Sequence, residues 1–103
     1  MKIEFFYFKE CPGYQSALSL LEQILLENGT AVAIEKIEIT TQDMALQHRF
    51  LGSPSIRING KDIEGLEEAS DYGLKCRIYL DTGSGIPSAA ILRKALQETE
   101  KGS

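Results

Sequence analysis

The sequence predicts a single α/β domain built on a four-stranded mixed sheet, and three observations lead to that prediction. The chain has 103 residues, a length that fits one hydrophobic core. Segments that favour strands and segments that favour helices follow one another in the order β-α-β-α-β-β-α. An Asn59-Gly60 pair lies between the third and fourth strands, and this pair is the strongest short signal for a hairpin. We therefore expect a domain over residues 1–99 with helices on both faces of the sheet, followed by a disordered tail over residues 100–103.

The first half of the chain predicts two strands, each followed by a helix. Apolar residues fill both faces of the first strand, as in a strand buried inside a mainly parallel sheet. Pro12 suits the first turn of a helix, and Gly29 and Gly52 suit the positions just after the two helices end. The expected elements are a strand over Ile3–Phe8, a helix from Pro12 to Asn28, a strand over Ala31–Ile39 and a helix from Thr40 to about Leu51.

The second half predicts a hairpin and a last helix, with a long segment between them. The expected elements are a strand over Ser55–Ile58, a return strand over Lys61–Glu64 and a helix from Pro87 to about Glu98. The segment Gly65–Gly85 is longer than a connection without structure of its own usually is. We therefore expect Tyr72–Tyr79 to be an ordered piece, and we place it against the hairpin because an exposed strand edge invites pairing.

The composition argues against several classes of function. A net charge of −4 does not favour a nucleic-acid surface or attachment to an anionic membrane, both of which need clustered basic residues. No apolar segment is long enough to span a bilayer, and the first residues lack the long apolar region of a secretory signal. Two cysteines cannot build the disulfide framework of a small secreted domain. We therefore expect a cytoplasmic protein that binds neither nucleic acid nor membranes.

Cys11 is our candidate for the residue that carries the chemistry. It lies where the first strand ends and the first helix begins, and the N–H groups and dipole of a helix N-terminus stabilise a thiolate. Lys9 favours that thiolate, whereas Glu10 opposes it. A stabilised thiolate is both a nucleophile and a good leaving group in disulfide exchange. We expect Cys11 to be partly exposed and more reactive than an ordinary thiol; the alternative is a small buried residue beside the sheet.

A second thiol is missing from the position where a dithiol motif would have it. Tyr14 occupies that position, so Cys11 must use an external thiol such as glutathione, or Cys76. Tyr14 either packs over the sulfur or contacts a ligand, or it is an ordinary aromatic residue on the first turn of the helix.

Cys76 has two possible locations. In a strand at the edge of the hairpin it would be two or more strands from Cys11, and neighbouring strands lie ~4.8 Å apart. If its segment instead folds back over the carboxyl end of the sheet, Cys76 approaches Cys11 as a resolving or metal-sharing thiol. We favour the edge location and therefore predict no stable disulfide between Cys11 and Cys76.

Other polar residues are not expected to carry chemistry. His48 is the only histidine, and one histidine with two widely spaced cysteines does not match the spacing of a zinc site. We expect His48 on a solvated helix face, and no metal site or bound cofactor. The expected solvated loop surface consists of the acidic residues Asp62, Glu64, Glu67, Glu68 and Asp71.

The motifs together resemble a known family. The run Tyr7-Phe8-Lys9-Glu10-Cys11-Pro12 resembles the active-site loop of thioredoxin- and glutaredoxin-like proteins, and Phe50–Glu64 looks like their cis-proline hairpin. With Tyr72–Tyr79 and Gly85-Ile86-Pro87, the chain is similar to a group of short bacterial thioredoxin-like proteins, mostly of unassigned function. Some members of this group are catalogued as selenoprotein relatives and others as alkylmercury-lyase-like.

The resemblance implies a thioredoxin-like fold with Cys11 at the active-site position. It also implies a cis bond before Pro54, which is a minority state that usually serves a purpose. In this fold the proline lies opposite the reactive cysteine, and the backbone before it pairs with an extended peptide substrate. The ordinary alternative is a proline that starts an edge strand. The candidate substrate-binding residues are Pro12, Tyr14, Ser53 and Pro54.

Three functions agree with these observations. The first is monothiol thiol–disulfide redox chemistry, in which Cys11 attacks a disulfide, a peroxide or a glutathionylated substrate that can be a protein. The second is a thiol-based binder of soft metals or organomercurials, because thiolates favour soft ions. The third is a non-catalytic module that holds a peptide beside Pro54. The separation between Cys11 and Cys76 is the observation that best distinguishes them.

Overall fold

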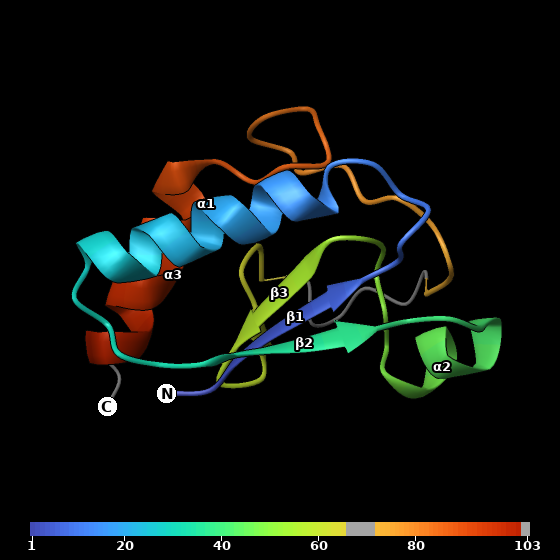
Figure 1. Cartoon of the computed structure of the whole chain (residues 1–103), viewed down its shortest axis with the longest axis horizontal. Coiled ribbons are helices and arrows are strands. Elements are labelled where there is room, and N and C mark those ends of the chain that lie inside the picture. Colours follow the sequence, from blue (N-terminus) through green and yellow to red (C-terminus); the bar gives the residue numbers. More distant parts are fainter. Residues whose placement is uncertain (66–71, 102–103) are drawn as a thin grey trace.

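A computed structural model describes residues 1–65 and 72–101 of the chain, as an α/β arrangement of a four-stranded mixed sheet and three helices (Figure 1). The elements are β1 (Ile3–Tyr7), α1 (Tyr14–Glu27), β2 (Ile34–Glu38), α2 (Gln42–Gln47), β3 (Ser55–Ile58), β4 (Lys61–Asp62) and α3 (Ala89–Lys101). The α/β class and the four-stranded mixed sheet are as predicted. Helix α3 includes the first two residues of the expected tail, and residues 102–103 lie outside the described part. No helix of the described part is long and apolar enough to cross a membrane.

The sheet brings two loops to the same end of the molecule. Its strand order is β2-β1-β3-β4, with β1 parallel to β2 and antiparallel to β3. Phe6, near the end of β1, is paired with Ser55, the first residue of β3. The loop that follows β1 therefore lies beside the loop that precedes β3. These two loops contain Cys11 and Pro54.

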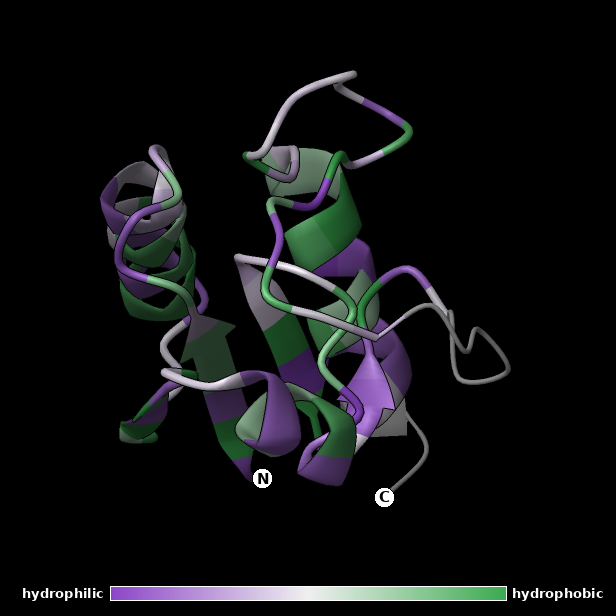
Figure 2. Cartoon of the chain, turned by 90° about the vertical axis from the view of Figure 1, so that its right-hand side faces the viewer, coloured by the Kyte–Doolittle hydropathy of each residue, from purple (hydrophilic) through white to green (hydrophobic). Residues whose placement is uncertain are grey.

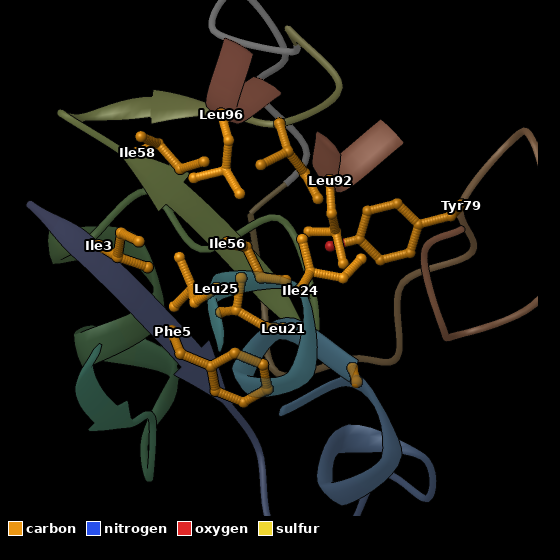
Figure 3. Close-up of a cluster of buried hydrophobic side chains, with 12 residues drawn as sticks. Ile3, Phe5, Leu21, Ile24, Leu25, Ile56, Ile58, Tyr79, Leu92 and Leu96 are labelled. Atoms are coloured by element: carbon orange, nitrogen blue, oxygen red, sulfur yellow. The ribbon is translucent and has the colours of Figure 1, made fainter. Parts of the chain in front are cut away.

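The two faces of the sheet bury separate clusters. The larger cluster lies between the sheet and the helices α1 and α3, with Tyr79 added from the segment before α3 (Figure 3). Its fully buried side chains include Ile3, Phe5, Leu21, Ile56, Tyr79, Leu92 and Leu96. The smaller cluster, on the opposite face, consists of Phe6, Ile39, Ala45 and Phe50. Figure 2 shows hydrophobic and hydrophilic residues alternating along the helices, as expected for helices that bury one face.

The segment that contains Cys76 does not extend the hairpin. Its described contacts with the sheet region include an isolated parallel bridge between Ser53 and Cys76, and Tyr79 forms an antiparallel bridge with Ser84. In Figure 1 this orange segment runs beside the blue loop that follows β1. The prediction that Tyr72–Tyr79 pairs with the hairpin edge is therefore wrong, because its backbone pairs with the loop before β3 instead.

Candidate functional site

Cys11 lies in the turn between β1 and α1, as predicted. Its N–H donates to the carbonyl of Phe8 at 3.0 Å, which turns the chain immediately after β1. Gly13 is the N-cap of α1 with φ 94°, a left-handed conformation that glycine adopts without steric cost. Helix α1 has no side-chain cap and no acidic residue in its first turn, so its N-terminal dipole is not neutralised by its own side chains.

Cys11 is buried rather than partly exposed. The residue is 2% exposed, so the expected exposure is wrong. The loop before β3 covers it, because the Sγ atom of Cys11 lies 3.5 Å from the carbonyl oxygen of Ser53. The carbonyl oxygen of the adjacent Pro12 lies 3.8 Å from the same atom. Pro12 itself is exposed.

The Ser53–Pro54 bond is cis, and its loop is bonded to the end of β1. The hydroxyl of Ser53 accepts a hydrogen bond from the N–H of Phe8 at 2.9 Å. Pro54 is buried beside this contact. The predicted cis bond and the predicted position next to the Cys11 loop are both observed.

Cys11 and Cys76 form a disulfide. Their Cα atoms are 5.6 Å apart, within the usual range for a disulfide, and 65 positions separate them in the sequence. The prediction that they form no disulfide is therefore wrong, because the Cys76 segment passes over the carboxyl end of β1. Cys76 is an exposed residue, in contrast to Cys11.

Ser53 holds the Cys76 segment by its backbone. Its N–H donates to the carbonyl of Lys75 at 2.8 Å, and its carbonyl accepts from the N–H of Arg77 at 2.9 Å. The backbone that the sequence suggested for pairing with a substrate thus pairs with the chain's own segment. Gly52 permits this approach: at its φ of 122°, an added Cβ would lie 3.0 Å from the Cβ of Arg77.

A buried ion-pair cluster anchors the residue after Cys76. Arg77 donates to both carboxylate oxygens of Asp62, at 2.6 and 2.7 Å, and to Glu64 at 2.9 Å. The three side chains are at most 6% exposed. Burial alone would lower the pKa of Arg77, but the hydrogen bonds and charge of its partners outweigh burial and raise it. The expectation that Asp62 and Glu64 form a solvated surface is wrong, because they neutralise a buried guanidinium.

The remaining members of the expected acidic surface, Glu67, Glu68 and Asp71, lie outside the described residues. Sequence reasoning missed the role of Arg77. The available signal was a basic residue inside a β-favouring stretch, together with acids on the return strand of the hairpin.

Tyr79 makes a second anchor for the same segment. Its side chain is fully buried, and its hydroxyl donates to the carbonyl of Pro54 at 2.6 Å. The guanidinium of Arg77 lies 4.5 Å from the centre of the Tyr79 ring. Burial raises the pKa of the Tyr79 phenol, so it stays a hydrogen-bond donor at neutral pH.

Two other residues singled out from the sequence have structural contacts. The ring of Tyr14 stacks on Tyr7 with centroids 4.8 Å apart. His48 is the C-cap of α2 and is half-buried, with its ring 5.8 Å from that of Phe6, so it is only partly solvated. Within residues 1–65 and 72–101, no three His, Cys, Asp or Glu side chains group as metal ligands would.

Comparison with known proteins places part of the chain in a protein family. Residues 13–79 match a protein family described as a domain of unknown function, DUF2703. The matched range begins two residues after Cys11 and includes Pro54, Cys76 and Arg77. No curated protein and no solved structure matches the chain. Since the match covers well over half of the residues, the chain belongs to the DUF2703 family.

Proposed function

We propose that this chain is a thioredoxin-like protein that carries out thiol–disulfide exchange, with Cys11 and Cys76 as its redox couple. The observation that carries the proposal is the disulfide between a cysteine at a strand-to-helix junction and an exposed cysteine. The element order and the loop of Ser53 and Pro54 beside Cys11 support the thioredoxin-like part of the proposal.

The disulfide changes the form of chemistry that the sequence suggested. A monothiol mechanism needs an external thiol to release each substrate, whereas Cys76 supplies a second thiol within the chain. In the proposed reaction a dithiol substrate or reductant gives two electrons and two protons to the Cys11–Cys76 disulfide. The protein gains two thiols and the partner becomes a disulfide; the reverse reaction oxidises a dithiol to a disulfide.

The surroundings of Cys11 support its role as the sulfur that becomes a thiolate. The uncapped N-terminus of α1 follows two residues later and favours negative charge there. Lys9 contributes less than the sequence suggested, because it is exposed and lies 3.9 Å from Glu38.

The two alternatives are less well supported. A peptide-holding module would need backbone groups of Ser53, and both of them already pair with Lys75 and Arg77. A soft-metal binder would need the reduced cysteines, which would then offer two neighbouring thiolates. Metal binding would therefore depend on the same reduction step.

A redox titration tests the proposal. The wild-type chain is equilibrated in buffers of reduced and oxidised glutathione, quenched with acid, alkylated and weighed by mass spectrometry. We expect one reversible transition in which two thiols appear together. Cysteines that alkylate in every buffer, or a disulfide that no thiol buffer reduces, would contradict the proposal.

A turnover assay completes the test. The wild-type protein should speed up the reduction of a small model disulfide by a dithiol. The variants Cys11→Ser and Cys76→Ser should each be slower by about tenfold or more, because each removes one half of the couple. Equal rates for all three proteins would count against catalysis by this pair.

A further inference from the structure

We infer that the incoming thiolate attacks Cys76, and that Cys11 is the leaving group. This inference rests on the proposed function and deepens it, because it says which sulfur of the couple meets the partner. The position of Cys11 in the strand-to-helix turn suggested the opposite order, with Cys11 as the sulfur in contact with substrate. The exposure of the two residues, the atoms around Cys11 and the anchors of the Cys76 segment all favour Cys76.

The disulfide is accessible from one side. Cys11 is 2% exposed, whereas Cys76 is an exposed residue. The segment after Cys76 alternates in the same way: Ile78 is 61% exposed and Leu80 is 84% exposed, while Arg77 and Tyr79 point inward. Cys76 is thus the exposed member of the disulfide, and Cys11 is the buried one.

The geometry of disulfide exchange makes this difference decisive. A thiolate attacks one sulfur along the line of the S–S bond, from the side opposite the other sulfur. To attack Cys11, it would have to reach the sulfur of a buried residue, and the carbonyl oxygens of Ser53 and Pro12 lie 3.5 and 3.8 Å from that Sγ atom. Those oxygens carry partial negative charge and repel an anion. Cys76, in contrast, is an exposed residue.

Cys11 is suited to leave. When the Cys11–Cys76 bond breaks, both of its electrons go to the Cys11 sulfur, which lies just before the uncapped N-terminus of α1. The nearby carbonyls oppose the charge on that thiolate. Protonation relieves the opposition, since the S–H group can then donate to the carbonyl of Ser53.

The Cys76 segment keeps its place through the exchange. Its backbone is bonded to Ser53 on both sides of Cys76, Arg77 is held by Asp62 and Glu64, and Tyr79 is bonded to Pro54. The partner therefore forms a mixed disulfide at a sulfur that does not move away from Cys11. The second thiolate of a dithiol partner then attacks the partner's own bonded sulfur and releases Cys76 as a thiolate. Two protons from solvent complete the reduction.

The experiment identifies the sulfur that carries the adduct. Oxidised wild-type protein is mixed with glutathione for short times, quenched with acid, unfolded in acid, and labelled at its free thiols with N-ethylmaleimide. Peptide mapping then counts glutathione and label on each cysteine. We expect glutathione on Cys76 and label on Cys11, in an excess of about tenfold or more over the reverse pattern. The matched control repeats the reaction on the same protein unfolded in urea, where the preference should vanish.

The outcomes separate the two proposals. Glutathione mainly on Cys11, or equally on both cysteines of the folded protein, would overturn the order of attack and leave the redox couple standing. A disulfide that glutathione and a dithiol both fail to open would overturn both. A second measurement uses single-thiol chains: Cys76 in the Cys11→Ser variant should react with a small aromatic disulfide about tenfold faster than Cys11 does in Cys76→Ser.

Discussion

Cys11 and Cys76 are held in place by different kinds of structure. Cys11 lies between two regular elements, so its position depends on the end of β1 and the start of α1. Cys76 lies in a segment outside the named strands and helices, which is bonded through its backbone to Ser53 and Phe50. Its position depends on these contacts and on the side chains of Arg77 and Tyr79. The comparison indicates that substitutions around Cys76, remote in sequence from Cys11, decide whether the pair can form.

The largest effect is expected when the buried ion-pair cluster loses its cation. Arg77→Met leaves the carboxylates of Asp62 and Glu64 buried without a partner, and we expect a loss of about 3–5 kcal/mol of unfolding free energy. The matched control is Arg93→Met, which breaks an exposed pair with Glu27 and should cost less than about 1 kcal/mol. Urea unfolding measures both. Equal losses would show that the cluster does not anchor the segment.

Reduction of the disulfide should have the next largest effect. A cross-link that spans 65 positions restricts the unfolded chain, and its loss should lower the unfolding free energy by about 4 kcal/mol. Because the Arg77 and Tyr79 anchors remain, amide hydrogen exchange of the Cys76 segment should rise only as much as global stability falls. Selective loss of protection in residues 72–80 alone would show that the disulfide is the main anchor.

Gly52→Ala tests the close approach between the two loops. The added Cβ would be 3.0 Å from the Cβ of Arg77, at a φ that disfavours side chains. We therefore expect the unfolding free energy to fall by about 2 kcal/mol or more. Gly29→Ala is the matched control, since it also has positive φ but no atom within 4 Å of the added Cβ. Gly29→Ala should lower the unfolding free energy by about 1 kcal/mol in the same experiment. Equal stability of the two variants would show that the close contact between Gly52 and Arg77 does not contribute to the stability of the fold.

Tyr79→Phe gives the smallest expected change in stability among these tests. It removes the hydroxyl that donates to the carbonyl of Pro54, and it should lower the unfolding free energy by about 1–2 kcal/mol. Tyr14→Phe, whose hydroxyl contacts only Gln15 among the described residues, should be near neutral. Thermal or urea unfolding of the two variants side by side makes the comparison. A neutral Tyr79→Phe would remove this contact from the account.

The sequence predicted the parts of the molecule that depend on local patterns. The apolar, β-favouring segments, the Asn59-Gly60 turn and Pro12 were enough to predict the strands, the hairpin and the junction at Cys11. The location of Cys76 depends instead on long-range contacts. Ser53 pairs with residues more than twenty positions away, and Arg77 binds Asp62, which lies 15 positions before it on the return strand of the hairpin. The general tendency of a free edge to be covered pointed to the wrong location because it ignored this buried charge.

The burial of the site was missed for a related reason. A helix N-terminus indicates where a thiolate is stabilised, but it does not indicate what covers the sulfur. The cover on Cys11 comes from Ser53 and from the segment that Gly52 admits, neither of which is adjacent in sequence. The same contacts explain the wrong expectation for the backbone of Ser53. The proline motif indicates that this backbone pairs with an extended segment, but it does not indicate whether that segment is a substrate or part of the same chain.

The pairing of Cys11 with Cys76 is the claim on which the rest depends. The most direct measurement is mass spectrometry of the purified protein, digested without reduction while free thiols are blocked. We predict one linked peptide pair containing Cys11 and Cys76, which separates into two peptides after reduction. Recovery of both cysteines as separately blocked peptides, from protein that has been exposed to oxidised glutathione, would contradict it.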